Sequence, residues 1–406
     1  MIGRASVNSV RFGPWGWDED GIDGRSLRRR QGAIVDAVTR LVVRAPGRVN
    51  LIGEHTDYNN GIVLPVAIDL GISIDFEPTS TRRIELTLAT DGRRASVDLD
   101  AIGRPTGDWT DYVAGTAWAL TAAGASLTGF RGTLSADLPI GAGLSSSAAL
   151  ELAIAWALAR GAAPLGDRLA AARAAQRGEN EFVGVACGPM DQYAVAFGEA
   201  GRALLLDCRA VTHRAIDLPA GIALVVIDSG VQRRLAESGY GDRRAACMRA
   251  VAQIRRVAPG VSSLRDVTPA LLVDARGRMD PEAFRRARHV VTENGRVLAA
   301  AEALEAGDLE ALGRLFAASQ ASMRDDFEMS TPEIDRLVDL ALSVSGVVAA
   351  RLTGGGFGGS TINLVAEGSV ADVEAAVRSG YQTPAGRSAA VRRVIASDGV
   401  RSVAAS

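Results

Sequence analysis

The sequence contains no lysine, because every one of its 45 basic residues is arginine. This absence excludes two catalytic devices, the lysine Schiff base and the lysine of the Walker A phosphate loop. Cysteine is scarce as well: the three residues are odd in number and match no zinc spacing, so we expect reduced thiols. The formal net charge of −2 gives no electrostatic argument for binding nucleic acid.

Long hydrophobic runs are also missing from the sequence. No apolar N-terminal stretch resembles a signal peptide, and the alanine-rich segment 148–160 is too short to cross a bilayer. With 406 residues, 47% hydrophobic and 23% charged, the composition is that of a globular protein of two or three domains. We therefore expect a cytoplasmic protein without a membrane segment.

Strands and helices are expected in an irregular order along the chain. Alternating or apolar patterns predict strands at 62–70, 71–76, 83–88, 95–99, 130–136, 347–352 and 360–365. Helical periodicity predicts helices over 109–123, 148–160, 165–181, 281–304, 309–326 and 332–344. Because the two kinds of element do not alternate as in βαβ units, we predict an α+β fold with mixed or antiparallel sheets.

A segment rich in glycine and serine, Pro139–Leu150, precedes one of the predicted helices. Gly141 and Gly143 allow the backbone to approach a ligand closely, and a helix is expected directly after three consecutive serines. Free N–H groups and the positive end of the helix dipole suit a phosphate at such a junction. Without lysine, the phosphate would be held by N–H groups, serine hydroxyls and a divalent cation such as Mg²⁺. A plain loop before a buried helix is the alternative.

A second glycine-rich segment, residues 354–359, has the spacing G-x-G-x-x-G. A dinucleotide-binding fold requires a helix after this pattern, whereas the residues that follow here are typical of a strand. We therefore predict a glycine hairpin whose backbone comes close to a ligand or to the neighbouring domain.

The segment from Arg48 to Gly61 mixes charged and hydrogen-bonding side chains with turn residues. A loop of this kind presents side chains to a ligand, and its donors and acceptors suit a polyhydroxylated molecule. A solvated polar loop is the alternative interpretation.

Three further carboxylates are candidates for chemistry. Glu179 and Glu181 lie near the C-terminal end of a predicted helix, where the dipole disfavours negative charge, so a metal-facing role competes with surface placement. Asp191 follows a Gly-Pro break and is expected in the first turn of a new helix, where simple capping is the alternative.

Three of these segments together resemble the three motifs of the GHMP small-molecule kinases. They are, in order along the chain, Arg48–Asn60, Pro139–Leu150 and Leu352–Ser360. The first resembles the galactokinase signature in particular, through Gly47-Arg-Val-Asn-Leu-Ile-Gly-Glu-His-Thr-Asp-Tyr58. Smaller matches are Trp109–Val113, Gly188–Gln192, Ser238–Tyr240 and His289–Asn294, and the resemblance covers roughly residues 40 to 400.

The resemblance implies a two-domain GHMP kinase fold with the active site in the interdomain cleft. We expect an N-terminal extension (1–24), an N-terminal kinase domain (25–205) and a C-terminal domain (206–406) whose last strand pairs with either domain's sheet. It also implies transfer of the γ-phosphoryl group of MgATP to the anomeric C1 hydroxyl of D-galactose, giving galactose 1-phosphate and ADP. ATP and Mg²⁺ are the implied cofactors, and a monomer that binds neither nucleic acid nor membranes is expected.

The resemblance also implies roles for individual residues. Asp191 is the expected base for the C1 hydroxyl, with Arg48 beside it. The expected sugar-binding residues are Glu54, His55, Asp57, Gly188 and Tyr240. The phosphates are expected against Gly141, Ala142, Gly143, Leu144, Ser145, Ser146 and Ser147, with Trp109 near the adenine. Ser147 and Glu179 are the expected magnesium ligands, and whether Ser146 or Ser147 touches the metal stays open.

Two alternatives remain. Another sugar kinase on the same scaffold, for N-acetylgalactosamine, galacturonate or arabinose, would share the phosphate machinery, although Glu54 argues against galacturonate because a second carboxylate near C6 would repel it. A non-catalytic sugar and ATP sensor is the other alternative. Galactokinase-like sensors lack part of the serine loop, whereas Ser145–Ala149 and Asp191 are present here.

Overall fold

The computed structural model describes residues 40–139, 141–231 and 239–403. Arg40–Ser406 forms one compact unit. The expected N-terminal extension lies outside the described residues, and the domain boundary expected near residue 205 stays a prediction.

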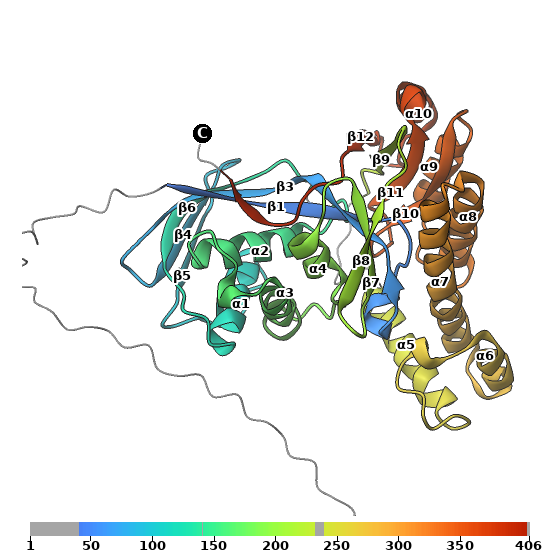
Figure 1. Cartoon of the computed structure of the whole chain (residues 1–406), viewed down its shortest axis with the longest axis horizontal. Coiled ribbons are helices and arrows are strands. Elements are labelled where there is room, and N and C mark those ends of the chain that lie inside the picture. Colours follow the sequence, from blue (N-terminus) through green and yellow to red (C-terminus); the bar gives the residue numbers. More distant parts are fainter. Residues whose placement is uncertain (1–39, 140, 232–238, 404–406) are drawn as a thin grey trace, which may run out of the picture. The chain divides into compact units, whose positions relative to one another are not determined.

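Three sheets organise the described residues (Figure 1). The six-stranded sheet has the order β13-β1-β3-β6-β4-β5 and contains β1 (Leu41–Asn50), β3 (Pro65–Pro78), β4 (Arg83–Leu88), β5 (Arg94–Asp98), β6 (Phe130–Ala136) and β13 (Arg401–Val403). The four-stranded sheet has the order β10-β11-β9-β12 and contains β9 (Ile222–Asp228), β10 (Val347–Thr353), β11 (Ser360–Ala366) and β12 (Ala390–Val394). The small sheet contains β2 (Ile62–Val63), β7 (Arg202–Asp207) and β8 (Thr212–Asp217). The described strand pairs are antiparallel apart from β4 with β6, so the sheets are mixed as predicted.

The pairing of β1 with β3 shapes the backbone that leads into the first motif. Ile72, Ile74 and Phe76 of β3 alternate with more exposed residues and point into the core. We expected a break at Gly71, but β3 continues through it. The register with β1 shifts at this point: Pro46 pairs with Gly71 and Gly47 with Ile68, so Asp69 and Leu70 of β3 form a bulge with no pairing partner in β1. Regular pairing resumes at Gly47, directly before Arg48.

Four helices lie on one side of the six-stranded sheet (Figure 1). They are α1 (Thr110–Ala122), α2 (Ser146–Leu158), α3 (Arg168–Arg177) and α4 (Met190–Phe197). Helices α1, α2 and α4 contact strands of the sheet, and α3 packs against these three helices. The central helix α2 is buried on all sides from Ala148 to Leu158, as its almost entirely apolar composition requires. Its one charged residue in this stretch, Glu151, is therefore buried too.

The second half of the chain contains the four-stranded sheet and further α-helices. They are α5 (Tyr240–Ile254), α6 (Pro269–Ala275), α7 (Pro281–Ala306), α8 (Leu309–Asp325), α9 (Pro332–Leu342) and α10 (Val370–Gly380). The side chains of Asp280, Asp308 and Thr331 accept backbone N–H groups and fix the starts of α7, α8 and α9. Helices α8 and α9 both contact β10. No helix in the described part of the chain is long and apolar enough to span a membrane.

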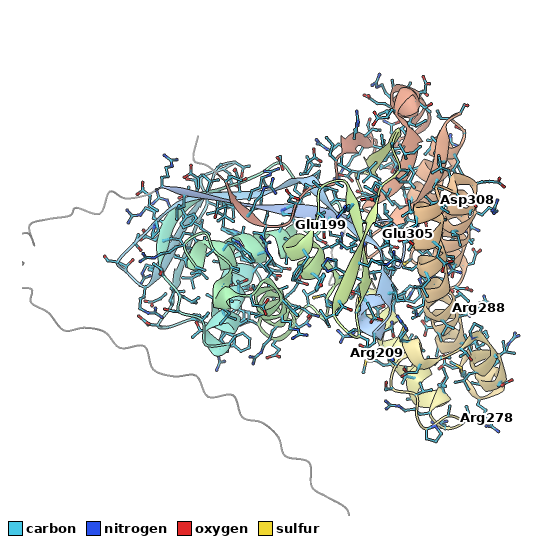
Figure 2. The ribbon with its side chains drawn as sticks, viewed as in Figure 1. Glu199, Arg209, Arg278, Arg288, Glu305 and Asp308 are labelled. Carbon is cyan, nitrogen blue, oxygen red and sulfur yellow. The ribbon has the colours of Figure 1, made fainter. Side chains whose placement is uncertain are left out.

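Charged side chains cover the outside of the fold (Figure 2). Glu305 of α7, for example, pairs with Arg214 of β8, and both side chains are about half exposed. Exposed pairs of this kind contribute only ~0–1 kcal/mol each.

Candidate active site

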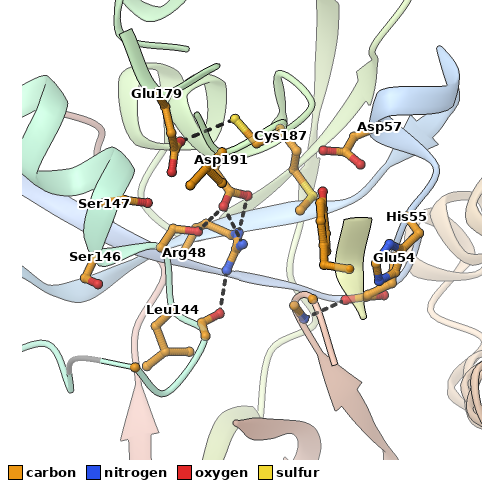
Figure 3. A pocket seen from close by; sticks show the side chains of 18 residues that line it. Arg48, Glu54, His55, Asp57, Leu144, Ser146, Ser147, Glu179, Cys187 and Asp191 are labelled. Carbon is orange, nitrogen blue, oxygen red and sulfur yellow. Dashed lines mark hydrogen bonds and ion pairs between the residues drawn. The ribbon is translucent and has the colours of Figure 1, made fainter. Parts of the chain in front are cut away.

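A cavity of about 150 Å³ lies where the three sequence motifs meet (Figure 3). Its wall is formed by the end of β1 and the loop after it, the loop before α2, the segment 179–191 and the β10–β11 hairpin. The structure thus brings most of the predicted site residues together. Those that line the cavity are Arg48, Glu54, His55, Asp57, Gly141, Gly143, Leu144, Ser145, Ser146, Ser147, Glu179, Asp191 and Tyr240.

Three predicted site residues do not line this cavity. Trp109 precedes α1 and packs against the core, so its role near adenine stays a prediction. The side chain of Ala142 is buried, although its carbonyl belongs to the glycine loop. Gly188 lies directly beneath Asp57: a Cβ at Gly188 would be 2.2 Å from Asp57 Oδ2. The glycine is therefore required for the placement of the carboxylate.

Arg48 and Asp191 form a two-point ion pair in the cavity. Arg48 Nε donates to Asp191 Oδ1 at 2.8 Å, and Nη2 donates to Oδ2 at 2.7 Å. The remaining guanidinium nitrogen, Nη1, donates to the carbonyl of Gly143 at 2.7 Å. Arg48 comes from the end of β1 and Asp191 from the first turn of α4, so the pair fixes a sheet, a helix and the glycine loop to one another.

Ser145 makes a contact that the sequence did not predict. Its hydroxyl donates to Asp191 Oδ2 at 2.6 Å, from a backbone in the left-handed region (φ 59°). A carboxylate oxygen accepts about two hydrogen bonds, so Arg48 and Ser145 together occupy Oδ2. Oδ1 keeps an open acceptor position, and it is the oxygen available to a ligand hydroxyl.

Glu179 lies in a π-helical turn (Gly178–Val183) that continues α3, where we had expected the α-helix to run on. Its side chain is 4% exposed, and burial, followed by the charge of Asp191, raises the pKa of the carboxyl to about 7. Glu181, by contrast, is exposed and pairs with Arg177 at 2.9 Å, so of the two expected carboxylates it is the surface one. A π-turn inside a helix often accompanies a functional site.

A buried polar network holds Glu179 from behind. Gln192 Nε2 donates to Glu179 Oε2 at 2.6 Å and to Glu151 Oε2 at 3.0 Å, and the Cys187 thiol also donates to Glu179 Oε2, at 3.3 Å. Burial and the charge of Glu179 raise the pKa of Glu151 well above its usual value. Oε2 of Glu179 is thereby turned into the protein, which leaves Oε1 for a ligand.

This corner of the cavity fits a divalent cation bound with phosphate. In the described parts of the chain, no arginine or histidine forms an ion pair with Glu179, so its buried carboxyl has no cationic partner within the protein. The hydroxyl of Ser147 lies on the side facing Glu179 (Figure 3). Serine and carboxylate oxygens of this kind, with substrate phosphates and water, are ligands that Mg²⁺ prefers.

Glu54 occupies the opposite side of the cavity and is held by a buried arginine. Arg351 of β10 donates to Glu54 Oε2 and, at 2.7 Å, to the carbonyl of Leu51, while Gly354 N–H donates to Oε1 at 3.1 Å. Both ionic side chains are at most 1% exposed. Burial raises the pKa of Glu54, and Arg351 counters it. Arg351 was missed, although a charged residue inside an apolar strand was a visible signal.

Asp57 and two rings complete the wall near Glu54. Burial raises the pKa of Asp57 to about 6, with a second contribution from the charge of Asp191. The ring of His55 lies 5.1 Å from that of Tyr240, and its Nδ1 is hydrogen-bonded to the Tyr58 hydroxyl at 2.7 Å. Carboxylates beside aromatic faces form a surface that accepts hydroxyl donors and packs against a sugar ring.

Three family signatures match successive parts of the chain. Residues 34–77 match the galactokinase galactose-binding signature, residues 111–199 the N-terminal domain of GHMP kinases, and residues 300–383 the C-terminal domain of GHMP kinases. The cavity described above draws its wall from the first two regions and from the hairpin inside the third.

Whole proteins and solved structures agree with these signatures. The chain is 45% identical to a galactokinase of Roseiflexus sp. (strain RS-1), over 93% of this chain and 97% of that protein. It is 46% identical to a galactokinase of Chloroflexus aggregans, over 85% and 89% of the two chains. The crystal structure of Lactococcus lactis galactokinase complexed with galactose superposes with a TM-score of 0.83, at 33% identity, over 89% of this chain and 94% of that one. Methanococcus jannaschii mevalonate kinase, at 18% identity and a TM-score of 0.61, shares the fold. The predicted two-domain α+β kinase fold is thus confirmed, and the chain belongs to the galactokinase family of GHMP kinases.

Proposed function

We propose that this chain transfers the γ-phosphoryl group of MgATP to the C1 hydroxyl of D-galactose, giving galactose 1-phosphate and ADP. The observation that carries the proposal is the Arg48–Asp191 pair, which stands between the serine loop and the carboxylates of the galactose-binding signature in one cavity. A relative that superposes with a TM-score of 0.83 was crystallised with galactose, which supports the choice of sugar.

Asp191 is proposed as the group that receives the proton of the C1 hydroxyl, at Oδ1. The Arg48 guanidinium holds the carboxylate in place through two hydrogen bonds. Two features of the reaction favour this proton transfer. An anomeric hydroxyl is more acidic than an ordinary alcohol, and a loose phosphoryl-transfer transition state depends mainly on positioning and charge stabilisation. Arg48 also places a positive charge beside the attacking oxygen.

The other site residues divide into two proposed groups. Glu54, His55, Asp57 and Tyr240 would orient the sugar, with Gly188 making room for Asp57. The loop from Gly141 to Ser147 would bind the phosphates, and Ser147 and Glu179 would hold Mg²⁺. When bound, Mg²⁺ neutralises charge on the phosphates of the donor. We also expect a monomer and a cytoplasmic location. Light scattering would test the monomeric state.

A coupled assay of ADP release across a panel of sugars, with and without Mg²⁺, tests the proposed function. We expect Mg²⁺-dependent turnover with the highest kcat/KM for galactose. If kcat/KM were higher for N-acetylgalactosamine, galacturonate or arabinose, that sugar and not galactose would be the preferred substrate. Binding of galactose and ATP without ADP release would instead establish a sensor.

Asp57 predicts a pH dependence of sugar affinity. Because its pKa is raised to about 6, the carboxylate that accepts sugar hydroxyls is present above pH 6 and is lost as the pH falls through that value. The galactose Kd, measured by calorimetry without nucleotide or Mg²⁺, should therefore rise between pH 7 and pH 5. An ordinary aspartate would lose its charge only about two units lower.

Asp57→Asn is the control for this prediction. The amide does not titrate, so this variant should bind galactose more weakly at pH 7 and show little change in Kd down to pH 5. If the variant kept the pH dependence of the unmodified protein, another group would be responsible.

A further inference from the structure

Three consecutive carbonyl groups of the glycine loop are held by donors from outside the loop. The carbonyl of Ala142 accepts from Ser360 Oγ at 2.8 Å, that of Gly143 from Arg48 Nη1 at 2.7 Å, and that of Leu144 from the Arg48 backbone N–H at 3.1 Å. The donors come from β1 and β11, which flank the loop.

This anchoring decides where the N–H groups point. In a trans peptide the C=O of one residue and the N–H of the next point in opposite directions. The N–H groups of Gly143, Leu144 and Ser145 are therefore directed away from Ser360 and Arg48. Within residues 40–139, 141–231 and 239–403, none of these three N–H groups donates a hydrogen bond, and all three residues line the cavity.

Ser360 holds the first of these peptide planes. It is the first residue of β11, is fully buried, and lies 218 residues from Ala142 in the sequence. Gly141 and Gly143 both have φ near +80°, and glycine has the greatest backbone freedom. Without contacts to other segments, the loop could therefore adopt several conformations. Arg48 fixes the planes after Gly143 and Leu144, but in the described part of the chain only Ser360 fixes the carbonyl of Ala142.

We propose that Ser360 is a positioning residue for the phosphoryl donor: by holding the Ala142 carbonyl out of the cavity, its hydroxyl presents the Gly143 N–H to an anionic phosphate. The inference rests on the proposed function for the identity of that phosphate, a nucleoside triphosphate bound with Mg²⁺. Ser360 is not among the residues that line the cavity, so we expect it to contribute to nucleotide affinity and not to sugar binding.

The test compares Ser360→Ala with Thr361→Val in the full chain. Thr361 is the next residue on β11, is equally buried, and uses its hydroxyl locally to accept from Asn363 Nδ2 at 2.9 Å. Calorimetry would measure the Kd of a non-hydrolysable MgATP analogue and of MgADP, without sugar, and then the Kd of galactose alone. Loss of one anchoring hydrogen bond should raise both nucleotide Kd values roughly three- to tenfold in Ser360→Ala, with the galactose Kd unchanged. Thr361→Val should bind both ligands as the unmodified protein does.

Three results would overturn the inference: unchanged nucleotide affinity in Ser360→Ala, an equal loss of nucleotide and galactose affinity, or the same nucleotide loss in Thr361→Val. If Ser360→Ala does not fold, Ser360→Cys carries the test, because a thiol is similar in size but a weaker donor, and nucleotide affinity should again fall alone. Failure of the proposed function would be seen in a different experiment. In that case the unmodified protein would bind nucleotide but would release no ADP when galactose is added.

Discussion

Asp191→Asn should lower kcat by roughly 10²–10⁴-fold, the usual contribution of one acid–base group, with little change in the KM for galactose. The amide has nearly the same shape as the carboxylate and still occupies the place beside Arg48 and Ser145, so the sugar can bind. It cannot take up the proton of the C1 hydroxyl. Steady-state ADP release with varied galactose measures both constants.

Asp242→Asn is the matched control for this variant. Asp242 is also an aspartate in the first turn of a helix, α5, but it is exposed and does not line the cavity. It should leave kcat unchanged. Near-normal turnover of Asp191→Asn would show that Asp191 is not the base, and an increase in KM alone would make it a sugar-binding residue.

Arg351→Met should destabilise the fold by about 3–5 kcal/mol, because it leaves a buried charge without its partner. Arg351 is the fully buried guanidinium that pairs with Glu54, so its removal leaves the Glu54 carboxylate buried without an ionic partner. The neighbouring Glu293, 3.8 Å from Arg351, keeps its ion pair with Arg296 at 2.6 Å. Equilibrium unfolding in urea, followed by circular dichroism, measures the loss.

Arg393→Met provides the comparison for an exposed pair. Arg393 of β12 pairs with Glu367 at 2.6 Å, and both side chains are about half exposed, so its removal should cost less than about 1 kcal/mol. The double variant Arg351→Met with Glu54→Gln should be less destabilised than the single Arg351 variant, since one uncompensated charge is gone. Equal costs for Arg351→Met and Arg393→Met would mean that the buried network contributes no more than a surface pair.

Much of the fold and the family could be predicted from the sequence because the signals are local. Helix α2, whose composition is almost entirely apolar, and the capped starts of α7 and α9 lie within two residues of the predicted positions. The three motifs and Asp191 were recognised from contiguous residues, and the structure places them around one cavity. The end of α3 was predicted less well. The helix was expected to continue to residue 181, but α3 ends at Arg177, and the π-turn that begins at Gly178 packs against Gly115.

The supporting contacts of the site could not be predicted in the same way. Ser145 reaches Asp191 across 46 residues, Gln192 reaches Glu151 across 41, and Arg351 reaches Glu54 across 297. Periodicity and turn chemistry describe neighbours in the sequence and contain no information about such partners. Only Glu151 and Arg351 gave a hint, as single charges within apolar segments that had to be buried.

The π-turn at Gly178–Val183 makes one part of the site depend on chain length as well as on residue type. In an α-helix each residue turns the chain by about 100°, and a π-turn amounts to one extra residue inserted into it. Deleting one residue from this π-turn would restore the α-helical register. The residues after the deletion would then be rotated relative to α3, even though the side chains that form the site were all still present. A survey of point substitutions would not detect this requirement, whereas an insertion or a deletion within six residues would.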